Sequence, residues 1–375
     1  MRHVPTHARS AAAALGALTL AIFAAGCSGG SGSVPGPATG VATTGGQTPG
    51  GSTAPLGPET FASFAVSSAD QAAAQSATAL TRHAFPIAPK VAALESSIHA
   101  RSPAARPEDV AYPEDLAYGG GSLVTNAVTH NVYLSVGTAN ASPATWGDPH
   151  KFLSDLFAST YLGVVDQYVG SGTYAVGESA LVTSTNFSYG PLYDNDLLAI
   201  IHSVASQMNP TGDNGYNVIY NLFLPPGVDT CYSYTAECYS PDHLSTFAFC
   251  AYHSSVTFTD IGHVLYTIQP YQPATVVEGG NTYESCSILS PQTDPNFLED
   301  ATDSSLEHET FETISDPDPP SGWTVPYSNG GVAGGNEMAD LCDYSSLESV
   351  LLNGTLYKIQ PMYSNKVHAC VNSYP

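Results

Sequence analysis

Hydrophobic and polar residues alternate with two different periodicities along the chain from about Tyr118 onward. Apolar and β-branched residues alternate with polar ones in some segments, which is typical of strands, and recur with helical spacing in others. Strands are predicted at 122–135, 216–224, 246–252 and 263–268. Helices are predicted at 151–162, 194–208 and 304–314. Because strands and helices intermix in one chain, the fold class is α+β or α/β.

The first residues carry the features of an export signal. Arg2 and Arg9 form a positive region, and the apolar run at 11–25 is too short to be a good membrane span. The ending Ala-Ala-Gly-Cys at 24–27 resembles a bacterial lipobox, in which Cys27 is acylated and becomes the first mature residue. The alternative is ordinary cleavage, which leaves Cys27 as a free thiol. We expect residues 1–26 to be a signal peptide and the protein to be an envelope lipoprotein, at the outer membrane or cell surface, or a secreted protein.

Two segments of biased composition follow the signal. Residues 27–58 are mostly Gly, Ser, Thr, Pro and Ala and cannot bury enough surface to order themselves, so a flexible tether is predicted. Residues 59–117 are Ala-rich with helical spacing and predict a helical extension, which is a stalk, a propeptide or a loosely docked helix. A single domain is predicted at 118–375.

The charge balance excludes one class of partner. The chain has 33 Asp and Glu against 9 Lys and Arg, and no Lys or Arg lies between Lys151 and Lys358. No basic patch can neutralise phosphates there, so nucleic acid is not expected as a partner. Buried carboxylates in this window must be hydrogen-bonded, protonated, paired with His or bound to cations.

The cysteines predict a disulfide framework. Six cysteines follow Cys27, and an even number in an exported chain indicates three disulfides among fifteen possible connectivities. Short loops favour Cys231 with Cys238, Cys250 with Cys286, and Cys342 with Cys370. No C-x-x-C is present, so thiolate zinc sites and thioredoxin-like chemistry have little support.

The segment around His308 carries the most specific chemistry. His308 and Glu312 lie four residues apart on a predicted helix, and therefore on one face. This is the spacing of H-E-x-x-H zinc sites with Glu in place of the second His. His308 and Glu312 would bind the metal, and Glu309 would be the general base that activates water. The alternative is a surface helix of ordinary acids beside a lone His.

A second acidic motif offers the remaining ligand. Glu337 and Asp340 are three residues apart, so one helical turn would aim both the same way. We expect Glu337 to be the third metal ligand, with Asp340 and Asp316 orienting the ligands. One His with two carboxylates is rich in oxygen, so calcium or manganese is an alternative to zinc. His253 and Trp323 are candidates for lining the site.

Together these motifs resemble the Exordium, or phosphate-induced protein, family of plants and its bacterial relatives. The matching segments include Leu123-Val-Thr-Asn, Tyr216-Asn-Val-Ile-Tyr, Phe249-Cys-Ala-Tyr-His, the segment 308–317 and the segment 336–342. They cover about 118–375 in the family's order. The resemblance implies an extracellular protein, and it supplies no firmly attached activity and no substrate.

We therefore expect a zincin-like α+β domain in which the motif helix packs under a mixed sheet and faces the turn that carries Glu337. The expected function is metal-dependent hydrolysis by an extracellular zinc peptidase that cuts a peptide or protein. The alternative is a non-catalytic surface protein in which the same acids bind a structural cation or brace the fold. Contact with a membrane is expected only through the N-terminal lipid.

Overall fold

A computed structural model describes much of the chain from residue 58 onward. The described residues are 58–79, 83–86, 115–137, 139–140, 142–184, 187, 191–209, 214–231, 238–239, 249–272, 275–278, 281–284, 296–326, 337–342 and 347–374. The predicted signal peptide, the acylation site at Cys27 and the tether up to residue 57 lie outside this set. No helix within it combines the length and the apolar character that crossing a bilayer requires.

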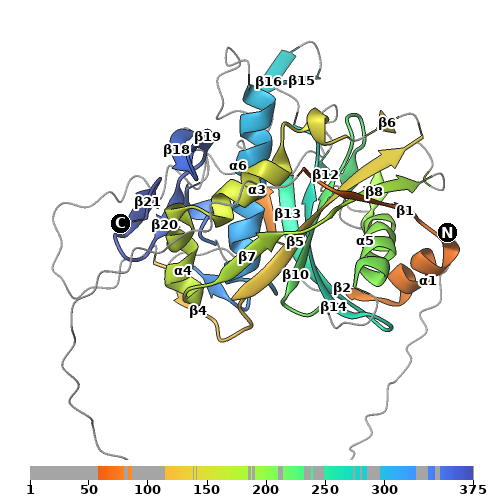
Figure 1. The fold of residues 1–375 in the computed structure, drawn as a ribbon, viewed down its shortest axis with the longest axis horizontal. Coiled ribbons are helices and arrows are strands. Elements are labelled where there is room, and N and C mark those ends of the chain that lie inside the picture. The colour runs from red at the N-terminus through yellow and green to blue at the C-terminus, as the bar shows by residue number, and fades with distance from the viewer. Residues whose placement is uncertain are drawn as a thin grey trace, which may run out of the picture. The chain divides into compact units, whose positions relative to one another are not determined.

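The centre of the fold is a mixed sheet (Figure 1). Its strands run in the order β1-β8-β5-β10-β14-β13-β2, with β3 added on β13 and with β6 and β7 added on β5. The bounds are β1 Phe61–Ala65, β2 Thr78–Ala79, β3 His83–Pro86, β5 Asn126–Val136, β6 Ala139–Asn140, β7 Thr173–Val176, β8 Ser179–Ser184, β10 Val218–Phe223, β13 Phe249–Phe258 and β14 Gly262–Gln269. The run from β1 to β14 is parallel, whereas β13 is antiparallel to β14. The predicted α+β class with a mixed sheet is confirmed.

Helices pack on both faces of this sheet (Figure 1). One core contains residues of α1 (Ser68–Ser76) and α5 (Asp194–Met208). The other core contains residues of α3 (Pro149–Phe157), α4 (Gly163–Val169) and α6 (Phe297–Ser315). Successive strand residues point to opposite faces, so Leu222 of β10 joins the first core and Phe223 joins the second. The nearly continuous apolar sequence of β10 follows from this coverage on both sides.

The motif helix α6 is longer than predicted. It begins at Phe297 rather than at the predicted residue 304, and it ends at Ser315, one residue beyond the predicted end at 314. Residues 300–316 are all buried, so this part of α6 has no solvent-exposed polar face. The first turns, Phe297-Leu-Glu-Asp-Ala-Thr-Asp-Ser, are mostly polar, so no apolar spacing marks the start of the helix in the sequence.

The N-terminal extension is corrected by the structure. Within its described residues only 68–76 is helical, and Phe61–Ala65 forms β1, which pairs in parallel with β8 at the edge of the central sheet. β2 and β3 pair with β13 at the other end of the sheet order. Residues 61–79 and 83–86 therefore belong to the folded domain that was predicted to begin at 118. Residues 80–82 and 87–114 of the predicted extension lie outside the described residues.

Small strand pairs and 3-10 turns complete the fold. The strands are β4 Ala117–Tyr118 with β17 Trp323–Thr324, β9 Leu192–Tyr193 with β11 Thr230–Cys231 and β12 Cys238–Tyr239, β15 Thr275–Glu278 with β16 Asn281–Glu284, β18 Glu348–Leu352 with β19 Thr355–Ile359, and β20 Met362–Ser364 with β21 Ala369–Val371. The 3-10 helices are η1 Pro143–Thr145, η2 Thr160–Leu162 and η4 Asp340–Cys342.

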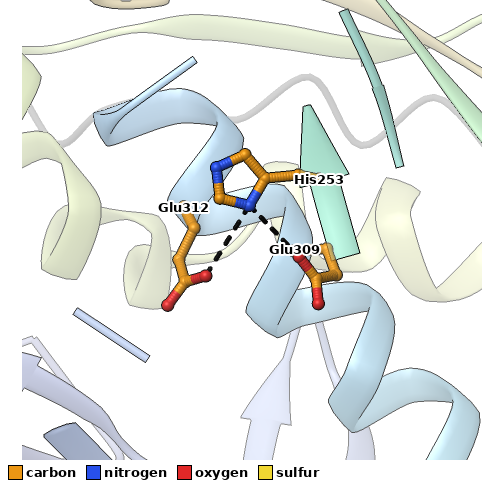
Figure 2. Close-up of side chains that lie close together, drawn as sticks. All are labelled: His253, Glu309 and Glu312. Atoms are coloured by element: carbon orange, nitrogen blue, oxygen red, sulfur yellow. Dashed lines mark hydrogen bonds and ion pairs between the residues drawn. The ribbon is translucent and has the colours of Figure 1, made fainter. Parts of the chain in front are cut away.

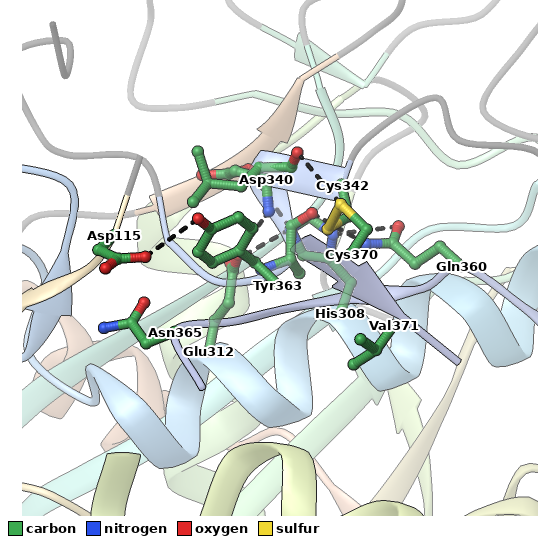
Figure 3. Close-up of a disulfide and its surroundings, with 12 residues drawn as sticks. Asp115, His308, Glu312, Asp340, Cys342, Gln360, Tyr363, Asn365, Cys370 and Val371 are labelled. Carbon is green, nitrogen blue, oxygen red and sulfur yellow. Dashed lines mark hydrogen bonds and ion pairs between the residues drawn. A yellow bond between two sulfur atoms is a disulfide. The ribbon is translucent and has the colours of Figure 1, made fainter. Parts of the chain in front are cut away.

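Two predicted disulfides are confirmed. Cys231 is bonded to Cys238, and Cys342 is bonded to Cys370, which ties η4 to β21 (Figure 3). Cys250 is also disulfide-bonded, whereas its predicted partner Cys286 lies outside the described residues. Disulfides persist in oxidising surroundings, so they support an extracellular location.

The segment after α6 is anchored to the sheet by Asp318. Its carboxylate accepts hydrogen bonds from Ser255 Oγ at 2.6 Å and Tyr216 Oη at 2.5 Å, and it lies 3.2 Å from His263 Nε2. Burial alone would raise the pKa of Asp318, but these three partners lower it to about 2. A carboxylate with a depressed pKa stabilises the fold above its unfolded pKa of about 4, and this contribution is lost as the pH falls toward 2.

We therefore expect Asp318→Asn to lower the free energy of unfolding at pH 7 and to flatten its decline between about pH 4 and pH 2. Urea titrations of both proteins across this range measure the two slopes. Equal slopes would contradict the assigned pKa shift.

Candidate metal centre

One group of candidate ligands lies between α6 and η4 (Figure 3). His308 Nε2 is 3.2 Å from Glu312 Oε2, one helical turn away, and 3.6 Å from Asp340 Oδ1. One potential ligand atom from each of these three residues lies within 4.8 Å of the other two. The predicted pair of His308 and Glu312 is thus brought together as the helical spacing required.

A hydrogen bond assigns the tautomer of His308. Gln360 donates through Nε2 to the carbonyl of Ala339 at 3.1 Å, so its other terminal atom, Oε1, is an acceptor. This oxygen is 3.4 Å from His308 Nδ1, and Nδ1 is therefore the nitrogen that carries the proton. The lone pair of Nε2 then faces the carboxylates of Glu312 and Asp340, which is a favourable arrangement only around a cation or a second proton.

The electrostatics of His308 agree with this geometry. Burial lowers the pKa of His308, but the carboxylates of Glu312 and Asp340 outweigh it and raise the pKa above 6.5. A second proton, on Nε2, would lie between the imidazole and the acids when no metal is bound. A divalent cation would displace that proton, because metal ligands bind in their deprotonated form.

Glu312 also connects the helix to the turn that carries Asp340. Its Oε1 accepts hydrogen bonds from the backbone N–H groups of Ala339 and Asp340, each at 3.2 Å. This leaves Oε2 directed toward His308. The carboxylate thus positions the turn with one oxygen and offers the other as a ligand.

A second group is centred on His253 of β13 (Figure 2). Its Nδ1 is 3.2 Å from Glu309 Oε2 and 3.7 Å from Glu312 Oε2. Its Nε2 lies 3.1 Å from the carbonyl oxygen of Asp316, which identifies Nε2 as a donor. His253, Glu309 and Glu312 form the second candidate metal-binding group, so Glu312 belongs to both.

The other predicted site residues, Glu337, Asp340 and Asp316, have contacts that differ from the predicted ones. Asp340, rather than Glu337, is grouped with His308 and Glu312. Glu337 Oε2 lies 3.7 Å from His253 Nε2, on the other side of the cluster. Asp316 contacts His253 through its carbonyl, while its carboxylate accepts a hydrogen bond from the N–H of Gly322 at 2.6 Å.

Trp323 packs against aromatic rings. Its ring is stacked on Tyr118, with centroids 5.6 Å apart, and meets Tyr168 edge-on at 5.3 Å. Gln360 is the residue that sequence reasoning missed. It lies 52 residues from His308, and nothing in its sequence surroundings marks it.

The donor set fits a divalent metal. The cluster contains two imidazoles together with carboxylates from α6 and from the 337–340 turn. Each candidate group combines one imidazole with two carboxylates, a ligand set that zinc accepts and that calcium or manganese, which prefer oxygen, can also use.

The cluster is closed to solvent. His253, His308, Glu309, Glu312 and Glu337 expose 0% of their surface, and the side chain of Asp340 exposes 7%. Acids buried to this degree cannot all be ionised without a compensating positive charge. A bound cation would supply that charge.

Comparison of the chain with protein families, with curated proteins and with solved structures finds no match.

Proposed function

We propose that the protein is an exported metal-dependent hydrolase with zinc at the centre built on α6. The observation that supports this most is the orientation of His308. Its Nδ1 is held by Gln360, and its Nε2 faces the carboxylates of Glu312 and Asp340. An imidazole oriented in this way by an outer hydrogen bond is the usual arrangement of a metal ligand.

The roles follow from the geometry. His308, Glu312 and Asp340 would hold the metal, which would act as a Lewis acid on a substrate carbonyl and lower the pKa of water. Glu309 follows His308 directly, and its carboxylate lies in one group with Glu312 within 4.8 Å. Glu309 would take the proton from the attacking water, and His253, with a proton on Nδ1 as well as on Nε2, would hold the Glu309 carboxylate in place by donating to it.

The resemblance to the Exordium family and the predicted N-terminal signal both support an activity outside the cytoplasm. An acylated Cys27 would attach the protein to the cell envelope. The substrate would be an extracellular peptide or protein.

A second candidate function has one specific observation in its favour. Complete burial of Glu309 leaves a substrate no open path to the base in this conformation. A non-catalytic surface protein, in which the same residues hold a structural cation, would need no such path. Catalysis would require a change of conformation that exposes Glu309 and the metal ligands to substrate during turnover.

Metal analysis of purified protein tests the centre itself. After zinc loading and dialysis, mass spectrometry should find about one equivalent in the parent and little in His308→Ala. His368→Ala removes a partly exposed histidine that contacts Asp115 instead, and it should keep the zinc. Equal zinc in the parent and His308→Ala would overturn the site. New peptide termini produced by the parent would favour the hydrolase over the structural centre.

A further inference from the structure

An acidic cavity of about 220 Å³ lies at the start of α6, where α3 and the β18–β19 hairpin meet it. Its wall contains Asp148 of the α3 cap and three acids of α6, namely Glu299, Asp300 and Asp303. None of these residues belongs to the candidate metal groups.

The one lysine in the wall, Lys151, pairs with an acid that does not line the cavity. Lys151 Nζ pairs with Asp155 and donates to Thr355 Oγ1 at 2.8 Å and to Tyr357 Oη at 3.0 Å. Asp155 is held in turn by Tyr357 Oη at 2.7 Å and by Asn353 Nδ2 at 3.1 Å. The ammonium of Lys151 is therefore used to balance Asp155.

The buried carboxylate of Asp303, which lacks a hydrogen-bond partner for one oxygen, points to a ligand. Its side chain is 2% exposed, it lies in the cavity wall, and its Oδ1 has no hydrogen-bond partner. Asp148 caps α3, and Glu299 and Asp300 lie in the first turn of α6, where acids stabilise a helix by its dipole. Asp303 lies about one turn farther along, so capping does not account for it.

Burial raises the pKa of Asp303 well above 3.8, and the charges of Glu299, Asp300 and Asp148 raise it further. Both effects disfavour the charged form of Asp303 in an empty cavity. A cationic guest would restore its charge and supply the missing hydrogen-bond donor.

The shape of the cavity selects the kind of cation. Within the described part of the chain, three ligand atoms of His, Cys, Asp or Glu gather within 4.8 Å only at the buried metal groups. The cavity acids are thus spaced too widely to enclose a bare ion. Leu356 in the wall is 64% exposed, and it pairs across the hairpin with Leu351, which is 66% exposed. A guest with an alkyl stem and a charged head would match the leucine at the rim and the acids within.

Glu299 has a fixed place in this wall. Its side chain lies against Gly147, where a Cβ would come within 2.6 Å of Glu299 Cγ. Gly147 also has φ +84°, a conformation that favours glycine. The local sequence thus makes room for an acid at the cavity.

We propose that this cavity binds an alkylammonium or guanidinium group, with its charged head on Asp303 and Glu299 and its stem along Leu356. The group belongs to a Lys or Arg side chain of a peptide or to a free diamine. Both sources share the same chemistry. The site does not depend on the proposed hydrolase activity.

Calorimetric titration of the full-length protein tests the proposal. The probes are Nα-acetyl-arginine amide, Nα-acetyl-lysine amide and cadaverine, with Nα-acetyl-norleucine amide as the uncharged match and calcium chloride as the bare cation. Asp303→Asn should weaken binding of the charged probes about tenfold or more, because it removes a charge-assisted hydrogen bond. Glu299→Gln should weaken it as well. Glu348→Gln removes an exposed acid of β18 outside the cavity and should leave binding unchanged.

The outcomes separate the sources. Tighter binding of the blocked amino acids assigns the site to a peptide, and tighter binding of cadaverine assigns it to a free diamine. Binding of norleucine amide equal to lysine amide, binding of calcium alone, or unchanged affinity in both Asp303→Asn and Glu299→Gln would overturn the proposal. Asp303→Asn should melt at or above the parental temperature, because an unpartnered buried acid is removed. If Asp303→Asn fails to fold, Glu299→Gln provides the test. Zinc content is measured in each variant, and an unchanged value shows that a loss of probe binding does not arise from damage to the metal centre.

Discussion

Glu309→Gln is expected to lower the rate of hydrolysis by about 10²- to 10⁴-fold while the zinc content stays at the parental level. Gln has the size and shape of Glu but cannot accept a proton from water. Glu309 is in the group with His253 and Glu312, not with His308 and Asp340, so its loss should leave the three proposed metal ligands intact. Initial rates and metal content of the same preparations measure both effects.

Glu307→Gln is the matched control. Glu307 is on the same helix, is 0% exposed, and lies outside both candidate metal groups. Burial raises the pKa of Glu307 well above 4.5 and so disfavours its charged form, and an uncharged amide of the same shape should change little. Undiminished activity in Glu309→Gln would refute its role as base. Loss of zinc together with activity would make Glu309 a ligand, through the group that contains His253.

The second large effect is expected at Glu312, whose two oxygens do different things. Glu312→Ala removes the ligand Oε2 and the acceptor Oε1 for the N–H groups of Ala339 and Asp340. It also leaves the imidazole of His308 without its nearest carboxylate. We expect a loss of about 3–5 kcal/mol in the free energy of unfolding, as for other broken buried pairs, together with loss of zinc.

Glu312→Gln separates the two roles. Its amide oxygen can still accept from the turn, but the amide is a poor metal ligand. Metal-free Glu312→Gln should therefore unfold closer to metal-free parent than Glu312→Ala does, while both variants lose zinc-dependent stabilisation. Denaturant titrations with and without zinc distinguish these cases. If Gln and Ala at position 312 were equally destabilising without metal, the hydrogen bonds from Ala339 and Asp340 to Glu312 would contribute nothing to stability.

The helix that carries the site could be predicted because its evidence is local. The four-residue spacing of His308 and Glu312 and the stop at Asp316-Pro317 need no knowledge of the fold. The same holds for the disulfide Cys342–Cys370, whose short loop made it the favoured pairing. The strands β10 and β14 could be predicted because buried strands are long apolar runs.

What could not be predicted depends on distant contacts. β1 is a short segment of small residues and two phenylalanines, and only its pairing with β8 makes it a strand. Glu337 and Asp340 lie on one short turn, and its orientation, fixed by Glu312, decides which of them meets His308. The contact between His253 and Glu309 joins residues 56 positions apart, which no spacing rule reveals.

The disulfide between Cys342 and Cys370 determines when the metal centre can be assembled. Cys342 ends the turn that carries Asp340, so the disulfide and the hydrogen bond to Glu312 both hold this turn. Such a bond does not persist in a reducing cytoplasm. Under the proposed function, the full ligand set would therefore form only after export, and the protein would take its ion from the metals available outside the cell rather than from the cytoplasmic pool.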